Sequence, residues 1–267
     1  MVKIINGTQI AEKIKDAVAK NIFELNGPRP NLAIVLVGER SDSKLYVSLK
    51  EKEGKKVGVE THAYKLPEDV SETELLAVIA FLNKDELIDG ILVQLPLPDK
   101  FDADKVIAAI DPLKDVDGFH PQHPDYIVSP VLASIVACLE DIGFTATHKT
   151  ACVLYNSEVF GASVKDILEK QGLKVSLKTD SDKADVLVTA LGEPRRIKKE
   201  MIKDGAVIID IGITKEDDKV WGDVDFEDVK DRASYITPVP GGIGPMTIAF
   251  LFKNVLEIFK RRHDQQY

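Results

Sequence analysis

The chain has only two cysteines among its 267 residues. Cys138 and Cys152 each lie in an apolar stretch and lack the close paired spacing that is typical of a metal site. Buried free thiols are therefore favoured over a disulfide or a metal centre. We expect no bound metal.

The chain also lacks a long apolar run and an excess of basic charge. No apolar stretch approaches the roughly 18 residues of a membrane span, and residues 1–6 lack the apolar core of a signal peptide. The net charge of -9 argues against a polyanionic partner, although residues 44–56 are locally rich in lysine. We expect a cytoplasmic protein that binds neither membrane nor nucleic acid.

Buried strands and amphipathic helices alternate along the first part of the chain. The composition, 44% apolar and 30% charged, is that of a globular protein with one large or two ordinary domains. Residues 32–37, 59–64 and 90–93 are predicted strands, and residues 43–57 are a predicted helix. Another helix begins at Ser71, with Glu74 completing a capping box. This alternation favours a mainly parallel sheet.

A second alternation follows residues 111–124, which are rich in turn formers. Its predicted strands are residues 151–155, 173–177, 186–190 and 206–211, with helical patterns between them. That arrangement is typical of a doubly wound nucleotide-binding unit. We therefore predict an α/β chain of two domains, with the boundary in the turn-rich segment.

Gln94 is a polar residue in the otherwise apolar run of residues 90–98, which ends in two prolines. Because proline cannot continue a sheet ladder, Gln94 is expected at the carboxyl end of a buried strand. Open α/β sheets bind their ligands at that edge. Gln94 is thus a candidate site residue.

Tyr46 and Lys50 are four residues apart in the predicted helix 43–57, so their side chains share one face about one turn apart. A lysine desolvated beside a ring and an amide can transfer protons near neutral pH. The alternative is an ordinary pair on a helix surface.

Two further segments are candidates for ligand contact. Asp115 and Asp117 stand two residues apart before a glycine, where one carboxylate can turn inward and accept the paired donors of a flat ring. The alternatives are an Asx turn and a loop metal site. Residues 237–247 combine prolines with glycines, which suits either a ligand cradle or a rigid interdomain connection.

Together these motifs resemble the methylenetetrahydrofolate dehydrogenase/cyclohydrolase family. The resemblance rests on Tyr46-x3-Lys50 and on residues 93–98, 114–119, 222–224 and 238–247, in the family's order over nearly the whole chain. It implies a folate-binding catalytic domain, residues 1–120, and a Rossmann-like nucleotide-binding domain, residues 121–244. It also implies that the C-terminal helix, within residues 245–267, returns to the first domain.

The resemblance also implies a role for individual residues. Lys50 corresponds to the catalytic group of the cyclohydrolase step, Gln94 to its hydrogen-bond partner, and Tyr46 to the ring that packs against the folate. Asp117 corresponds to the anchor of the pterin. The remaining assignments are Pro240, Gly241 and Gly242 to the folate cleft, and Tyr155, Asn156, Ser157 and Ile213 to the dinucleotide.

The nucleotide half departs from the family pattern. Where the family carries Gly-Arg-Ser, this chain has Tyr155, Asn156 and Ser157, followed by Glu158. The tyrosine adds bulk, the missing arginine removes a phosphate partner, and the glutamate adds negative charge, so each change opposes NADP binding.

Three hypotheses follow. The first is a bifunctional enzyme that uses NADP, with NAD as the alternative cofactor. The second is a cyclohydrolase that has lost hydride transfer, and the third is a non-catalytic folate-binding scaffold. Because family members are commonly dimers, the resemblance also implies a homodimer.

Overall fold

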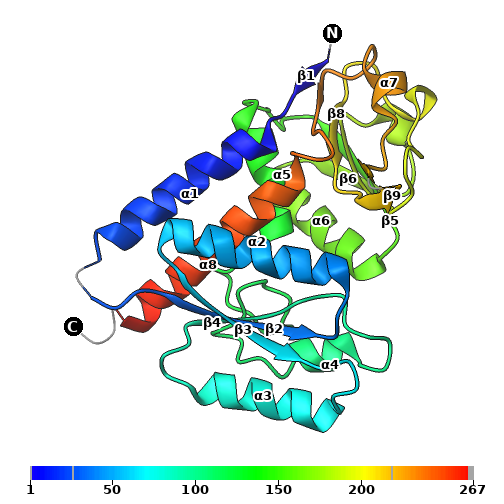
Figure 1. Ribbon diagram of the computed structural model, residues 1–267. Coiled ribbons are helices and arrows are strands. Elements are labelled where there is room, and N and C mark those ends of the chain that lie inside the picture. The colour runs from blue at the N-terminus through cyan, green and yellow to red at the C-terminus, as the bar shows by residue number, and fades with distance from the viewer. Residues whose placement is uncertain (1, 26, 218, 264–267) are drawn as a thin grey trace. The chain divides into compact units, whose positions relative to one another are not determined.

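The computed structural model describes residues 2–25, 27–217 and 219–263, and its chain folds into two compact units (Figure 1). One, the six-stranded unit, comprises the described residues within 2–12 and 131–247. The other, the three-stranded unit, comprises the described residues within 13–130 and 248–263. Among the described residues, no helix is both long and apolar enough to cross a membrane.

The three-stranded unit is built on a parallel sheet. The central strand β2 (Asn31–Val37) pairs with β3 (Glu60–Leu66) on one side and β4 (Gly90–Val93) on the other. Alternate side chains of β2 enter two different hydrophobic clusters, so both faces of the sheet are buried. The inner strand β2 and its neighbour β4 are therefore largely apolar, whereas the edge strand β3 has exposed polar residues at Glu60, His62 and Lys65.

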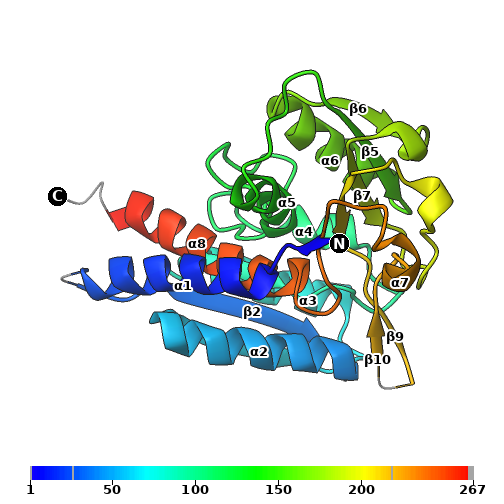
Figure 2. The same cartoon turned by 90° about the horizontal axis from the view of Figure 1, so that it is seen from above.

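Helices cover both faces of this sheet. They are α1 (Gly7–Phe23), α2 (Ser41–Val57), α3 (Glu72–Lys84), α4 (Ala103–Ile107) and α8 (Ile243–His263). Val47 of α2 and Phe252 of α8 pack on one face, and Leu75 of α3 packs on the other. Within this unit α1 and α8 lie side by side (Figure 2), and Lys260 Nζ donates to Asn21 Oδ1 at 2.7 Å.

The six-stranded unit has the strand order β1-β11-β8-β7-β5-β6, and all neighbours are parallel. The strands are β1 (Lys3–Ile4), β5 (Thr150–Tyr155), β6 (Lys174–Leu177), β7 (Val186–Ala190), β8 (Val207–Asp210) and β11 (Tyr235–Ile236). The chain goes from β5 outward to β6 and then returns to β7 on the other side. The carboxyl ends of β5 and β7 therefore flank a topological switch point, the usual ligand-binding position in doubly wound sheets.

Short elements complete this unit. They are α5 (Pro130–Asp141), α6 (Glu158–Lys170), α7 (Phe226–Val229), the antiparallel hairpin of β9 (Thr214–Glu216) and β10 (Lys219–Trp221), and the 3-10 turns η1 (Ser181–Lys183) and η2 (Lys199–Met201). Helix α6 connects β5 to β6, as the alternating pattern predicts. Both cysteines are buried and free.

The units differ from the expected domains, residues 1–120 and 121–244, at two places, and residues 245–247, expected to return to the first domain, belong to the six-stranded unit. Residues 1–12 join the six-stranded unit because Lys3 pairs with Tyr235 in a parallel ladder. Residues 121–130 join the three-stranded unit, where Ile127 is buried in the core. Of the C-terminal segment expected to return, residues 248–263 join the three-stranded unit, and residues 264–267 lie outside the described part of the chain.

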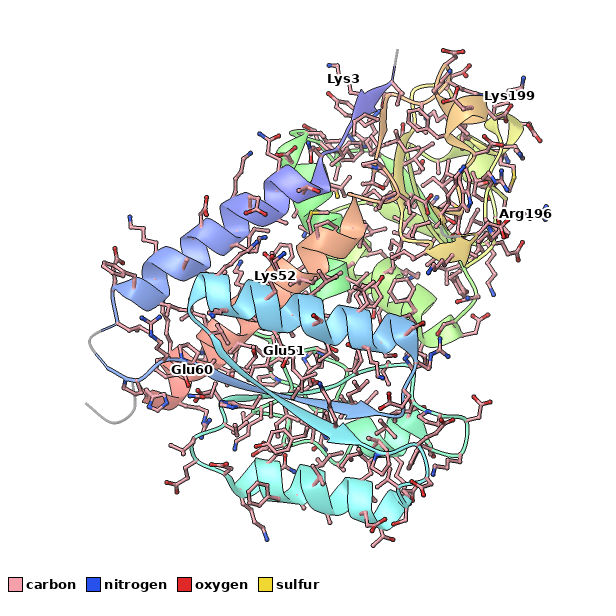
Figure 3. All side chains as sticks on the ribbon, viewed as in Figure 1. Lys3, Glu51, Lys52, Glu60, Arg196 and Lys199 are labelled. Carbon is pink, nitrogen blue, oxygen red and sulfur yellow. The ribbon has the colours of Figure 1, made fainter. Side chains whose placement is uncertain are left out.

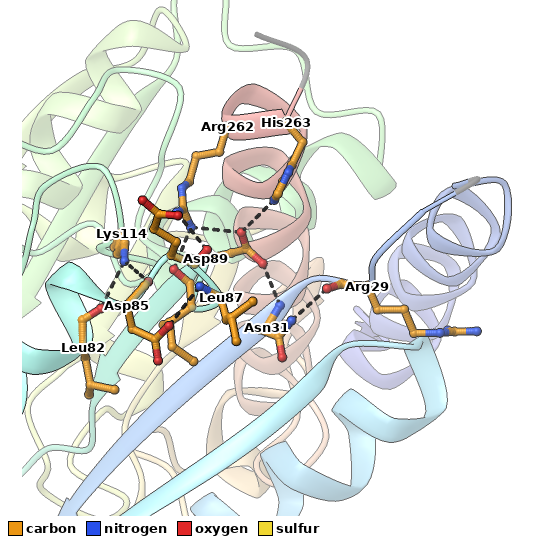
Figure 4. A network of polar contacts seen from close by, with 11 residues as sticks. Arg29, Asn31, Leu82, Asp85, Leu87, Asp89, Lys114, Arg262 and His263 are labelled. Atoms are coloured by element: carbon orange, nitrogen blue, oxygen red, sulfur yellow. Dashed lines mark hydrogen bonds and ion pairs between the residues drawn. The ribbon is translucent and has the colours of Figure 1, made fainter. Parts of the chain in front are cut away.

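A buried carboxylate, Asp89, holds helix α8 to the amino-terminal end of the three-stranded sheet (Figure 4). Asp89 accepts hydrogen bonds from the Asn31 backbone N–H at 2.8 Å and from Arg262 Nη1 at 3.0 Å. His263 Nε2 lies 3.3 Å from the same carboxylate, and Arg262 also donates to the Ile88 carbonyl. Burial raises the pKa of Asp89, while Arg262 and His263 oppose that rise.

We expect Arg262→Met to destabilise the three-stranded unit by about 3 kcal/mol at pH 7, because it leaves a buried carboxylate without its main counter-charge. The pKa of Asp89 in the folded state would rise further. A folded pKa above the unfolded value adds stability at low pH that is lost as pH rises through it, so the deficit should shrink toward pH 4. Urea denaturation at pH 7 and pH 4 measures the loss of unfolding free energy. Hydrogen exchange of the amides in β2 and α8 then shows whether the loss lies in this unit. Arg261→Met, an exposed neighbour on α8, should cost less than about 1 kcal/mol.

Candidate active site

Lys50 and Gln94 meet at the carboxyl end of the three-stranded sheet. The Gln94 backbone N–H donates to the Val35 carbonyl at 2.9 Å, which extends the ladder one residue beyond β4. The Leu95–Pro96 peptide, which is cis, then ends the strand. Lys50 Nζ donates to Gln94 Oε1 at 2.8 Å, and Gln94 Nε2 donates to the Leu95 carbonyl at 2.6 Å. The second bond fixes the amide so that its oxygen faces the lysine.

The loop that carries Asp117 is shaped by its neighbours. The buried Asp115 accepts the backbone N–H of Asp117 at 3.1 Å and that of His120 at 2.7 Å. Buried Lys114 donates to the carbonyls of Leu82 and Asp85 (Figure 4). The Asx-turn alternative is thus correct for Asp115, which leaves Asp117 as the carboxylate that is half-buried at this edge.

Lys50 and Asp117 influence each other's charge. Burial lowers the pKa of Lys50, and the negative charge of Asp117 opposes that fall. Burial raises the pKa of Asp117 to about 6, with Lys50 opposing the rise and Asp115 adding to it. The pKa values of both groups are therefore shifted toward neutral pH, and a proton-transfer group works best when its pKa lies near the working pH.

The structure brings Lys50 and Gln94 into contact as expected, and it places Tyr46 one turn before Lys50 on α2. Tyr46, Lys50, Gln94 and Asp117 are all half-buried, so each retains surface that a ligand can reach. Their individual roles remain predictions.

The segment Pro240, Gly241 and Gly242 lies in the six-stranded unit, where it contacts the start of α1. The Thr8 backbone N–H donates to the Gly241 carbonyl at 3.1 Å, and Gly241 has a φ of 101° that favours glycine. A side chain on Gly7 would come within 1.9 Å of the Gly242 carbonyl oxygen. Gly242 is buried and Pro240 is exposed, so packing explains part of this motif. Its expected place in the folate cleft stays a prediction.

Asn156 and Ser157 stabilise the switch point between β5 and β7. The Asn156 backbone N–H donates to the Ala190 carbonyl at 3.2 Å, and its side-chain Nδ2 donates to the Leu191 carbonyl at 2.9 Å. Ser157 caps α6 by accepting the Phe160 N–H at 3.4 Å. Two residues expected at the dinucleotide site therefore hold the two loops of the switch point in place.

Tyr155 does not project its bulk into the sheet edge as the sequence suggests. The residue is 5% exposed, and its ring packs on Gly161, where a Cβ would lie 2.4 Å from a ring carbon. The hydroxyl donates to Glu158 at 2.8 Å. Because the ring packs against α6, a direct cofactor contact for Tyr155 is not supported. Ile213, which follows β8, is 50% exposed and presents apolar surface.

Sequence reasoning missed a buried carboxylate that holds the loop after β7. Asp223 accepts the Thr189 hydroxyl at 2.9 Å and the backbone N–H groups of Leu191 and Glu193 at 2.6 and 2.9 Å. Its own N–H donates to Asp210, whose carboxyl pKa is raised to about 7 by burial and by the Asp223 charge. This network fixes the β7 side of the switch point.

Two glycines, Gly212 and Gly222, are the features of the sequence that could have revealed this network. A Cβ on Gly212 would lie 2.3 Å from the Asp223 carboxyl, and one on Gly222 would lie 2.0 Å from Asp210 Oδ2. The sequence shows the motif of residues 222–224 only as part of the family resemblance. Its glycine is needed because two carboxylates pack against backbone there.

Comparison with known proteins agrees with this geometry. The family models "Tetrahydrofolate dehydrogenase/cyclohydrolase, catalytic domain" and "NAD(P)-binding domain" match residues 5–117 and 130–263. The bifunctional protein FolD of Sulfurihydrogenibium sp. is 41% identical over 97% of this chain and 98% of its own length, and that of Geotalea uraniireducens is 43% identical over 98% and 100%.

Solved structures give the same result. The bifunctional enzyme FolD from Campylobacter jejuni superposes with a TM-score of 0.94 at 34% identity, covering 98% of this chain and 100% of that one. The Trypanosoma brucei FolD, complexed with NADP cofactor and inhibitor, gives 0.91 at 30% identity and covers 98% of each chain. With both domain models matched and relatives similar over nearly its whole length, the chain belongs to the tetrahydrofolate dehydrogenase/cyclohydrolase family.

Proposed function

We propose that the chain is a bifunctional enzyme of one-carbon folate metabolism. It oxidises 5,10-methylenetetrahydrofolate with NADP and hydrolyses the resulting 5,10-methenyl cation to 10-formyltetrahydrofolate. The observation that carries the proposal is the hydrogen bond between Lys50 and Gln94 at the carboxyl edge of the sheet. Family membership supports it, because relatives over nearly the full length are bifunctional FolD proteins.

In the hydrolysis step, water adds to the cationic carbon between the two folate nitrogens. The added water loses a proton, and one carbon–nitrogen bond opens to leave the formyl group on the other nitrogen. Lys50 suits this transfer because burial lowers its pKa, which increases the fraction of neutral amine near pH 7. Gln94 holds Nζ in one direction, so the proton acceptor is positioned before substrate binds.

Asp117 is proposed to anchor the pterin. An ionised carboxylate can accept two hydrogen bonds from adjacent N–H groups on such a ring. Tyr46, one turn before Lys50, offers an aromatic face beside it. Pro240 and Gly241 are proposed to complete the folate site, with Gly242 supporting them from its buried position.

Folate binding should weaken in acid because Asp117 has a pKa raised to about 6. Below that value the carboxyl is protonated, so we expect the Kd of tetrahydrofolate to rise about tenfold between pH 7 and pH 5. Titration calorimetry across that range measures it. Asp117→Asn should weaken binding by about 30-fold or more at pH 7 and flatten the pH profile. Exposed Asp125→Asn is the control and should leave both unchanged.

The residues at the switch point fit a dinucleotide. The first turn of α6 presents backbone N–H groups, Asn156 and Ser157 fix the turn before it, and Ile213 offers an apolar surface. Bound NADP would accept the hydride from the methylene bridge. Glu158 opposes a phosphate here, but its side chain is 76% exposed, and an exposed ion pair is displaced at little cost.

The acidic first turn of α6 favours a second candidate, a cyclohydrolase without dehydrogenase activity. Two assays on purified protein separate the candidates: absorbance of reduced nicotinamide with methylenetetrahydrofolate plus NADP or NAD, and hydrolysis of methenyltetrahydrofolate without cofactor. Hydride transfer together with hydrolysis supports the bifunctional enzyme. Hydrolysis alone supports the second candidate, and the absence of both contradicts each and leaves the folate-binding scaffold.

We further propose a homodimer that works in the cytoplasm. Two buried free cysteines are compatible with a reducing compartment. The dimer is an inference from the family alone. Light scattering after gel filtration should give twice the chain mass of 29.5 kDa, and a mass of one chain would contradict it.

A further inference from the structure

Tyr155, Glu158 and Lys178 form a polar cluster where β5 and β6 end. Lys178 Nζ donates to Glu158 Oε1 at 2.6 Å and lies 4.1 Å from the centre of the Tyr155 ring. The Tyr155 hydroxyl donates to the other carboxylate oxygen, Oε2, at 2.8 Å. Glu158 is thus held by two donors, and the lysine has both a ring and a carboxylate as partners. We call these three residues the β6-end cluster.

Lys178 lies where doubly wound domains contact the ribose of a bound dinucleotide. It directly follows β6, and its backbone N–H donates to the Val153 carbonyl of β5 at 2.9 Å. It comes 20 residues after Glu158, the first residue of α6. At about this separation from the first turn, such domains contact the ribose that carries the 2′ group. An acid there binds the hydroxyl of NAD, and a nearby basic side chain accommodates the phosphate of NADP.

The backbone of Lys178 adds a second observation. Its φ is 59°, in the left-handed region that residues other than glycine rarely adopt. The local backbone therefore favours glycine, whereas the chain has a lysine whose ammonium is aligned by the ring and the carboxylate. Asn156, which stands where the family has an arginine, donates to the Leu191 carbonyl and is committed to the loop. A basic group for the 2′-phosphate must then come from elsewhere at this edge.

We propose that Lys178 recognises the 2′-phosphate of NADP in this chain, and that Glu158 competes with that phosphate for its ammonium group. The inference rests on the proposed dehydrogenase function and specifies how its cofactor is selected. Both charged side chains are accessible, with exposed fractions of 46% for Lys178 and 76% for Glu158.

The competition favours the phosphate. An exposed ion pair shifts an equilibrium by about fivefold or less, whereas an ammonium and a phosphate form a strong charge-assisted hydrogen bond. Glu158 therefore lowers the preference for NADP over NAD without abolishing it. Tyr155 keeps the ammonium over its ring when the carboxylate leaves.

Titration calorimetry on the full chain, without folate, tests the proposal. The ligands are NADP and NAD, together with adenosine 2′,5′-bisphosphate and AMP, which isolate the 2′-phosphate. The variants are Lys178→Met and Glu158→Gln. The controls, Lys165→Met and Glu169→Gln, each disrupt an exposed ion pair of similar length, 2.7 Å, that lies within α6. Near-ultraviolet circular dichroism verifies that each variant is folded.

We expect Lys178→Met to raise the Kd of NADP and of the bisphosphate about tenfold or more, with NAD and AMP changed less than about twofold. Glu158→Gln should tighten NADP about three- to fivefold more than NAD. The control variants should bind all four ligands as the wild type does.

The outcomes separate this inference from the function it rests on. Suppose that the wild type binds NADP, and that Lys178→Met either weakens the binding of NADP and NAD equally or leaves both unchanged. The assignment of Lys178 is then wrong, while the dehydrogenase proposal stands. If the wild type binds no dinucleotide but Glu158→Gln binds NADP, Glu158 blocks the site, and the inference that the phosphate displaces it from Lys178 is wrong. If neither the wild type nor Glu158→Gln binds a dinucleotide, this inference and the dehydrogenase half of the function are both wrong. The hydrolysis assay then decides between the cyclohydrolase and the folate-binding scaffold.

Discussion

Lys50→Met is expected to reduce the rate of methenyltetrahydrofolate hydrolysis by about 100- to 10,000-fold, the range that a positioned proton-transfer group contributes. Methionine keeps an unbranched apolar stem of similar length but has no proton to exchange. The substitution therefore removes the chemistry while it retains most of the packing of α2. Loss of the absorbance of the methenyl cation over time gives the rate.

The controls for this experiment lie on the same helix. Lys52 is exposed on α2 (Figure 3), so Lys52→Met should leave the rate within about twofold of wild type. Tetrahydrofolate should still bind to the Lys50→Met protein above pH 7 through Asp117 and Tyr46, but more weakly at pH 7, because loss of the Lys50 charge lets the pKa of Asp117 rise further. A folded Lys50→Met protein that retains a tenth of the wild-type rate would falsify the assignment of Lys50.

Asp223→Ala has the largest expected effect on the six-stranded unit. It removes the acceptor of the Thr189 hydroxyl and of the backbone N–H groups of Leu191 and Glu193. The Thr189 bond is buried and the two N–H bonds are partly buried, and an unsatisfied buried donor costs about 1 to 3 kcal/mol, so we expect a total loss of about 3 kcal/mol, with part regained as the Asp210 pKa falls. The loop after β7 should also lose its fixed conformation.

The single tryptophan makes this loss measurable in one unit. Trp221 lies on β10 in the six-stranded unit, so urea unfolding followed by its fluorescence reports on that unit. Asp231→Ala is the matched control, because Asp231 is an exposed residue of the same unit. It should change the free energy of unfolding by less than about 0.5 kcal/mol. Equal midpoints for the two variants would contradict the role of Asp223.

Local patterns predicted most of the strands and helices. The strand at Val186–Ala190 is observed with the expected bounds, and Ser71 and Glu74 form the expected capping box. These features depend on residues close together in the sequence. Strand β1 was missed because two residues carry no periodicity, and only its partner β11, more than two hundred residues later, makes it a strand.

The site was predicted where one side chain defines its chemistry. Gln94 was found because a lone amide ends an apolar strand, whereas its contact with Lys50 on α2 was expected only from the family resemblance. The functions of Asp115 and Asp117 could not be separated by spacing, because the Asx turn depends on His120 as well. The orientation of Tyr155 depends on the space left by Gly161, which no local pattern reveals.

The pairing of β1 with β11 also limits how the protein can be cut. The chain passes between its units near residues 12, 130 and 247, so neither unit is one continuous segment. A gene fragment encoding residues 131–247 alone would lack β1 and expose the free edge of β11. That edge could then pair with a strand of another molecule. Isolating the six-stranded unit for study would require joining residues 2–12 to residues 131–247 through a designed linker.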